Sequence, residues 1–141
     1  RYIPAFAEAG ADIITVHMEA ERDVKKSVDL IHHYGLKAGV AISPNTPELI
    51  LMNMLNQVEL VLVMTVNPGF GGQKFMPEAA KKVQAIRRMQ INPELRIGVD
   101  GGINLENVKS VIHDGADVII AGSTVFNAKN KALAINALRR G

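Results

Sequence analysis

The chain has 141 residues, of which 48% are apolar, 21% are charged and 4% are aromatic, and its formal net charge is +2. This length and apolar content fit a single domain with a real core, while the mild charge and scarce aromatic residues argue against nucleic acid as a partner. The absence of cysteine excludes disulfide and thiolate chemistry and suits a cytoplasmic protein, and the apolar runs are too short to span a membrane.

Five short runs rich in valine and isoleucine predict β-strands, at residues 12–18, 37–43, 60–66, 96–102 and 117–123. Each run is followed by a stretch with helical spacing, at residues 22–35, 47–57, 77–90, 104–115 and 129–140. Near-continuous apolar strands that alternate with helices are typical of a parallel sheet covered on its faces. The sequence therefore predicts an α/β fold, with one domain over residues 1–141.

Several residues mark the ends of these predicted helices. Pro77 suits a first helical turn, where a missing N–H costs nothing, and Asn104 suits the capping position before the next helix. Gly10, Gly35 and Gly115 each lie between a helical stretch and a strand, where a left-handed residue commonly ends a helix.

One helix-end and strand unit occurs twice in the chain. Residues 9–17, AGADIITVH, and residues 114–122, DGADVIIAG, are variants of the same Gly-Ala-Asp turn and apolar strand. Between the two copies the strand–helix units average about 26 residues, which suits a compact (β/α)8 barrel. We therefore predict about five of the eight units of a TIM barrel; a five-stranded doubly wound sheet is the alternative.

Both parallel architectures bind ligands at the carboxyl ends of their strands. The residues expected there are, in chain order, His17 and Glu19, Ser43 and Asn45, Met64 and Asn67, Asp100 to Gly102, and Gly122 with Ser123. The starts of the strands carry no comparable group of residues. We therefore expect the functional site at the carboxyl edge of the sheet.

The last two strand ends predict an anion site. Gly101 and Gly102 follow one strand, and Gly122 and Ser123 follow the next, each pair just before a helix. Backbone N–H groups at such positions bind phosphate without a basic side chain, and barrels often bind phosphate after their last two strands. Alternatively, these glycines only permit tight turns.

Asp100 is the leading candidate for a catalytic residue. It ends an apolar strand, where a carboxylate is costly unless it is hydrogen-bonded, paired or bound to metal; a loop cap is the alternative. His17 fits either a ligand or base, or a hydrogen-bonded histidine of the rim. His32 and the pair Arg87 and Arg88 lie in helical stretches, so we expect surface or packing roles for them.

Four segments of the chain resemble ribulose-phosphate 3-epimerases. They are TVHMEA (15–20), MTVNPGFGGQKF (64–75), VDGGIN (99–104) and GADVIIAGSTVF (115–126). The resemblance implies a phosphate-binding (β/α)8 barrel, an isomerase of the pentose phosphate pathway that interconverts D-ribulose 5-phosphate and D-xylulose 5-phosphate. It also implies a two-base mechanism, in which one aspartate removes the C3 proton, a metal-bound enediolate forms, and a second aspartate returns a proton to the other face.

The resemblance assigns roles to residues by position. Asp100 matches an aspartate that is both an acid/base and a metal ligand, and Met64 matches a methionine that borders the enediolate. The substrate-binding positions are Gly69, Phe70, Gly71 and Gly72 in a mobile loop over the substrate, Gly101 and Gly102 after the catalytic aspartate, and Gly122 and Ser123 at the phosphate end. The implied metal is Zn²⁺ or Fe²⁺, with Mn²⁺ or Co²⁺ as further options.

The first three strands of the family, with a serine, two histidines and an aspartate of the site, have no counterpart here. We therefore expect residues 1–141 to form a partial barrel of about the last five units, inactive alone and belonging to a longer, homo-oligomeric enzyme. The alternatives are an epimerase for a hexulose phosphate such as D-allulose 6-phosphate, and a non-catalytic phosphate-binding half-barrel.

Overall fold

The computed structural model describes residues 2–67, 69 and 73–140. The elements are α1 (Ile3–Glu8), β1 (Ile13–His17), α2 (Val24–His33), β2 (Lys37–Ile42), the 3₁₀ helix η1 (Glu48–Leu51), β3 (Leu60–Met64), α3 (Pro77–Ala80), α4 (Lys82–Met89), β4 (Arg96–Asp100), α5 (Val108–His113), β5 (Val118–Ile120), α6 (Gly122–Phe126) and α7 (Lys131–Arg140). All five predicted strands are confirmed. Within the described ranges, no helix combines the length and apolarity that crossing a bilayer requires.

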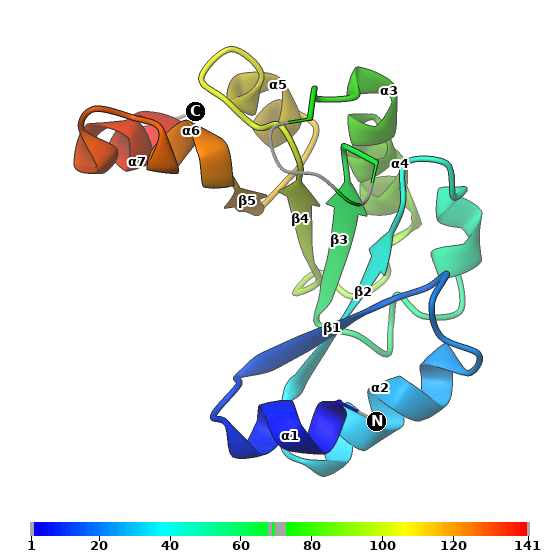
Figure 1. The fold of residues 1–141 in the computed structure, drawn as a ribbon. Helices are drawn as coiled ribbons and strands as arrows, with labels where there is room; N and C mark the ends of the chain where they lie inside the picture. Colours follow the sequence, from blue (N-terminus) through cyan, green and yellow to red (C-terminus); the bar gives the residue numbers. More distant parts are fainter. Residues whose placement is uncertain (1, 68, 70–72, 141) are drawn as a thin grey trace.

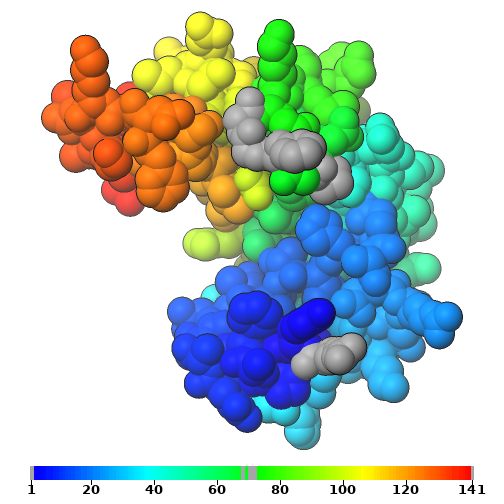
Figure 2. Space-filling view, in the orientation of Figure 1, coloured from blue at the N-terminus to red at the C-terminus, as the bar shows by residue number. Residues whose placement is uncertain are grey.

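The strands form one parallel sheet in the order β1-β2-β3-β4-β5 (Figure 1). Strands that follow one another in the chain are therefore neighbours in the sheet, as in a barrel. A doubly wound sheet would reverse its order at a switch point, so that alternative is wrong. The sheet is strongly twisted (Figure 1). A hollow separates the N-terminal part, in blue, from the C-terminal helices, in orange (Figure 2).

The two faces of the sheet differ in burial. Successive residues of a strand point to opposite faces. In β3, Val61 and Val63 are fully buried on the outer face, which the helices cover, whereas Leu60, Leu62 and Met64 are only partly buried on the inner face. The inner face thus carries large apolar side chains that the described residues leave partly open.

Glycines on the even strands make room for these inner side chains. A Cβ atom at Gly39 would lie 2.6 Å from Oγ1 of Thr15, and one at Gly98 would lie 3.0 Å from a methyl group of Leu62. Side chains from β1 and β3, such as Thr15 and Leu62, therefore alternate with glycines from β2 and β4. Such an alternation between odd and even strands is typical of the layered interior of a barrel.

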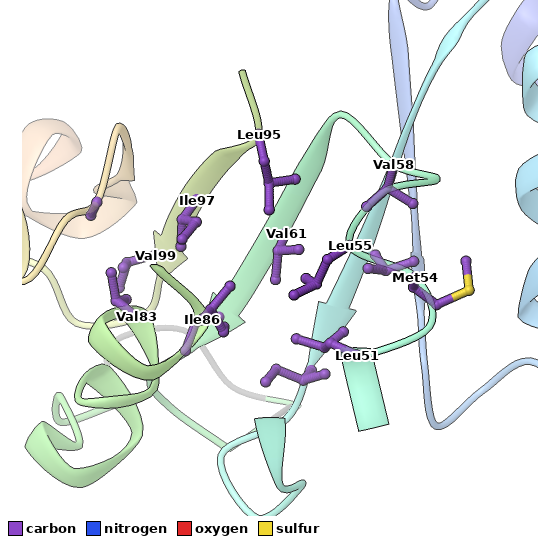
Figure 3. Packing of buried hydrophobic residues seen from close by; sticks show 14 of the residues in the cluster. Leu51, Met54, Leu55, Val58, Val61, Val83, Ile86, Leu95, Ile97 and Val99 are labelled. Carbon is purple, nitrogen blue, oxygen red and sulfur yellow. The ribbon is translucent and has the colours of Figure 1, made fainter. Parts of the chain in front are cut away.

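The main core lies between the outer face and the helices (Figure 3). Val83 and Ile86 of α4 pack toward Ile97 and Val99 of β4. The segment between β2 and β3 contributes Leu51, Met54, Leu55 and Val58. Removing these side chains from water drives the helices onto the sheet.

The predicted helix over residues 47–57 is wrong. The chain forms η1 there and continues in turns, with N–H groups of Met54 and Gln57 donating to carbonyls three residues earlier. This tighter winding still buries Leu51, Met54 and Leu55, so tertiary packing replaces the regular helix.

The remaining predicted helices form with shorter bounds. The helix over 77–90 is interrupted at Lys81, which separates α3 from α4. Asn104 caps a turn ahead of α5, because its Oδ1 accepts from the N–H groups of Glu106 and Asn107. The three glycines expected at helix ends, Gly10, Gly35 and Gly115, have φ angles of +93°, +75° and +113°.

Glu59, the residue before β3, clamps the start of β2. Its N–H donates to the carbonyl of Ala38 (2.9 Å), and its Oε2 accepts from the Ala38 N–H (2.7 Å). Nε2 of His32, on α2, lies 3.1 Å from both carboxylate oxygens. Burial alone would raise the pKa of Glu59, but these hydrogen bonds and the histidine hold it below its ordinary value.

Asp117, the residue before β5, clamps the start of β4 in the same way. Its N–H donates to the carbonyl of Ile97 (2.8 Å), and its Oδ2 accepts from the Ile97 N–H (3.0 Å). Arg87, on α4, donates to the Asp117 carboxylate and also to the carbonyls of Leu95 (3.0 Å) and Gly115 (2.8 Å).

These two clamps correct two expectations. Arg87 is not a solvated surface residue, because its side chain is 24% exposed and joins three segments. The strand starts are also not featureless, because Glu59 and Asp117 each fix the register of two strands and hold a helix beside them.

We predict that Asp117→Ala lowers the free energy of unfolding by about 1–3 kcal/mol, because the Ile97 N–H and the Arg87 guanidinium lose a charged acceptor. Urea unfolding followed by circular dichroism measures the change. The control is Asp114→Ala, whose side chain makes no hydrogen bond with a described residue. Equal stability of the two variants would contradict the clamp.

Candidate functional site

Asp100 and Met64 lie side by side at the carboxyl edge of the sheet. They are register partners in the β3–β4 pair and therefore point to the same, inner face. Asp100 is partly buried, and burial raises the pKa of its carboxyl group, while the charge of His17 offsets only part of this rise. The structure thus brings three of the expected residues toward one inner rim.

Thr65 fixes the chain at Asp100 and at the residue that follows it. It is fully buried; its N–H donates to the carbonyl of Asp100 (2.8 Å), and its Oγ1 donates to the carbonyl of Gly101 (2.6 Å). Its own carbonyl accepts from the N–H of Met76 (2.8 Å). The strand end that carries the carboxylate is therefore held rigidly.

Gly101 and Gly102 are required by the backbone at this point. Their φ angles are +128° and +68°, a region that other residues rarely adopt. A Cβ at Gly101 would lie 2.8 Å from the backbone nitrogen of Val66, and one at Gly102 would lie 2.6 Å from that of Phe75. The glycines thus let the segments after β3 and β4 pack closely together.

A cavity of about 280 Å³ lies directly beyond these glycines. Its lining residues are Gln73, Lys74, Phe75, Gly102, Asn104, Ser123 and Thr124. Oγ1 of Thr124 donates to the carbonyl of Ile103 (2.6 Å), which ties α6 to the segment after β4. The cavity therefore joins the ends of β4 and β5, where the sequence predicts an anion site.

The lining differs in detail from the prediction. Gly102 and Ser123 line the cavity, whereas Gly101 and Gly122 do not. The prediction missed five lining residues, although each lies within one of the segments that resemble the family: Gln73, Lys74, Phe75, Asn104 and Thr124.

One residue of the predicted loop over the substrate, Gly69, is among the described residues. Gly69 is exposed and has a φ angle of +131°. Phe70, Gly71 and Gly72 lie outside the described residues, so their assignment to the substrate stays a prediction.

A larger cavity, of about 560 Å³, lies between α5, β5 and α7. Its lining is mainly apolar and includes Ile112, Ile119, Val125 and Leu138. None of the predicted site residues lines it, so its size does not identify it as the functional site.

Glu19 is held as a structural acceptor beside His17. Its Oε1 accepts from the N–H of Ser43 (2.7 Å) and from Oγ1 of Thr46 (2.5 Å), and its Oε2 lies 3.9 Å from Nδ1 of His17. Burial alone would raise the pKa of Glu19, but these hydrogen bonds and the histidine lower it below its ordinary value. Glu19 is therefore ionised at neutral pH and braces the loop after β2.

Lys82 braces the same loop from α4. Its Nζ donates to the carbonyls of Pro44 (2.5 Å), Thr46 (2.6 Å) and Ser43 (3.2 Å). Burial lowers the pKa of Lys82, and the charges of Glu48 and Glu19 offset part of this. The ammonium group thus gathers three carbonyls at the rim of the sheet.

We predict that Lys82→Ala lowers the free energy of unfolding by about 1–3 kcal/mol, since three carbonyls lose a charged donor. Lys81→Ala is the matched control, because Lys81 is the exposed neighbour and donates no side-chain hydrogen bond to a described residue. Denaturant unfolding of both variants measures the difference. A loss of similar size in Lys81→Ala would show that the bonds to the loop contribute nothing.

The resemblance implies a divalent metal at this rim. Among residues 2–67, 69 and 73–140, no three His, Cys, Asp or Glu side chains are arranged to hold a metal ion. Glu19 is engaged by the loop after β2, so Asp100 is the remaining carboxylate among the rim residues that the structure describes. This set does not fit a complete metal site.

We predict that Asp100→Asn stabilises the chain at about pH 7 more than at about pH 4. Because the folded state raises the pKa of Asp100, ionisation of this group costs stability as the pH rises, and asparagine removes that cost. Thermal unfolding at the two pH values measures the difference, with Asp114→Asn as the control. A difference that does not change with pH would contradict the buried carboxyl.

A family model and the curated relatives of this chain point to the same family. A family model described as the ribulose-phosphate 3 epimerase family matches residues 1–126. A ribulose-phosphate 3-epimerase of Bacillus subtilis (strain 168) is 44% identical over 142 residues, which cover 99% of this chain and 65% of that protein. The chain spans less than two thirds of the length of the first curated relatives that it matches.

Solved structures agree on the fold. The 3-hexulose-6-phosphate synthase of Salmonella typhimurium matches with a TM-score of 0.73 at 21% identity, covering 98% of this chain and 64% of that one. A tryptophan synthase α-subunit of Pyrococcus furiosus matches with a TM-score of 0.72 at 19% identity, covering 99% of this chain and 59% of that one. Both are TIM-barrel enzymes, and the five-stranded sheet has the same barrel-type architecture.

Proposed function

Because the chain belongs to the ribulose-phosphate 3 epimerase family, we propose that it supplies the last five β/α units of an enzyme that interconverts D-ribulose 5-phosphate and D-xylulose 5-phosphate. The sequential order of the five strands and the share of the relatives' length that the chain spans support this proposal. The single observation that carries it is the placement of Asp100 on the inner face, next to the cavity that begins at Gly102.

Asp100 is the proposed acid/base for the C3 proton. A group that removes a proton from one substrate and returns one to the other works best when its pKa lies near the working pH. Burial at the end of β4 raises the pKa of Asp100 and so moves it toward the working pH. The bonds from Thr65 hold the strand end, so the carboxyl group keeps its position while its proton comes and goes.

The cavity after β4 and β5 is the proposed phosphate site. Ser123 and Thr124 bring hydroxyl groups, Gly102 brings open backbone, and Lys74 brings a positive charge. From there a five-carbon sugar phosphate would extend along the inner face toward Asp100 and Met64. The apolar Met64 side chain would limit water beside the reacting carbon.

A second carboxyl group and a divalent metal remain part of the proposed whole enzyme. Asp100 would be one metal ligand, and the other ligands and the second acid/base would come from the rest of that enzyme. The chain of 141 residues is therefore expected to be inactive alone.

The test compares the 141-residue chain with the same chain joined to the N-terminal third of the Bacillus subtilis relative. Epimerisation of D-ribulose 5-phosphate is measured with and without added Zn²⁺, Fe²⁺, Mn²⁺ or Co²⁺. We predict activity in the joined protein, and a loss of about 10²-fold or more in its Asp100→Asn variant, because a positioned acid/base contributes about that much.

Asp114→Asn in the joined protein is the matched control and should keep full activity. An Asp100→Asn variant with undiminished activity would overturn the role of this residue. Faster turnover of D-allulose 6-phosphate than of D-ribulose 5-phosphate would replace the proposed substrate with a hexulose phosphate.

A further inference from the structure

The outer edge of β1 is open in the described sheet. β1 pairs with β2 and with no other described strand. A groove of about 230 Å³ lies along this edge, and its lining includes Tyr2, Phe6, Ile14 and Thr15. Tyr2 and Phe6, beside the strand, are 72% and 56% exposed. An open strand edge next to exposed aromatic side chains is suited to receive another strand.

The two carboxylate clamps show how this fold attaches one strand to the next. In each clamp the residue before an odd strand, Glu59 or Asp117, uses its N–H and its carboxylate to hold both backbone groups of one residue. That residue, Ala38 or Ile97, is the second of the preceding even strand. The basic partner of the carboxylate comes from the helix that leads into the even strand: α2 carries His32, and α4 carries Arg87.

Asp12 occupies the same position before β1. In the repeated GAD unit it corresponds to Asp117. Its backbone carbonyl accepts from the N–H of Lys37 (3.1 Å), just as the carbonyl of Glu59 accepts from the N–H of Arg96 (3.1 Å). On the open side, neither the N–H nor the carboxylate of Asp12 is hydrogen-bonded to any residue that the structure describes.

We propose that Asp12 is the docking residue for a parallel strand on the open edge of β1. Its N–H and carboxylate bracket the second residue of that strand, and its carboxylate pairs with a basic side chain on the helix leading into that strand. The apolar side chains of the incoming unit cover the groove beside Tyr2 and Phe6.

The occupant is a β/α unit from the rest of the longer protein. The third of the Bacillus subtilis relative that the chain does not span is long enough for about three units of the size found here. The proposal rests on the partial-barrel part of the proposed function and not on the reaction.

A second copy of the chain fits this edge less well. The strand that it could offer is β5, the other edge of the sheet, which has three residues and is itself preceded by the clamping Asp117. The strands held by the observed clamps instead follow a leucine, Leu36 or Leu95, and carry no carboxylate at their start.

The test co-expresses the 141-residue chain with the N-terminal third of the Bacillus subtilis relative as a separate chain. Co-purification, the dissociation constant and amide hydrogen exchange of Asp12 are measured without substrate, so the outcome is independent of catalysis. We expect a complex in which exchange at the Asp12 N–H is slowed. Asp12→Ala should weaken the complex by roughly tenfold or more, as the loss of a charged hydrogen bond does.

Asp29→Ala is the matched control, because Asp29 is an exposed aspartate of α2 that pairs with Lys25. It should leave the complex unchanged, and neither variant should destabilise the free chain by the amount predicted for Asp117→Ala. The proposal is overturned if the wild-type chain forms no complex, if Asp12→Ala binds as tightly as Asp29→Ala, or if exchange at Asp12 is not slowed. Self-association of the chain that Asp12→Ala weakens would assign the edge to a second copy instead.

Discussion

The register between β3 and β4 is the constraint on which the candidate site depends. Met64 lies level with Asp100, and both point to the inner face. A slip of one residue would turn Asp100 toward the helices and move Val99 to the rim, because successive side chains alternate between faces. Thr65 opposes such a slip from the carboxyl end, where its N–H and hydroxyl group hold Asp100 and Gly101.

The two edges of the sheet carry polar groups in different arrangements. At the amino edge, Glu59 and Asp117 satisfy backbone groups of the neighbouring strand and contact basic side chains of the helices, His32 and Arg87. At the carboxyl edge the polar groups are spaced around a cavity, and the pKa of Asp100 is raised by burial. In barrels the ligand site lies at the carboxyl ends of the strands, and the amino ends contribute mainly to stability.

The sequence was sufficient for features that depend on local pattern. Runs of valine and isoleucine predicted all five strands, and Gly10, Gly35 and Gly115 predicted left-handed helix ends. Features that depend on distant partners were not predictable in this way. Arg87 is a charged residue in a helical stretch, which favours a surface position. Its role in the clamp depends on Asp117, which lies 30 positions later in the chain. The helix expected over residues 47–57 failed because packing of its apolar side chains outweighed its regular spacing.

The strand that carries Asp100 is held at both ends, and this restraint has a physical reason. A partly buried carboxyl group at the end of β4 costs stability when it ionises, so the strand needs bonds that do not involve that group. Asp117 brackets Ile97 at its start, and Thr65 holds the backbone at its end. None of these bonds uses the side chain of Asp100. The carboxyl group can therefore change its protonation state without loosening the strand that positions it.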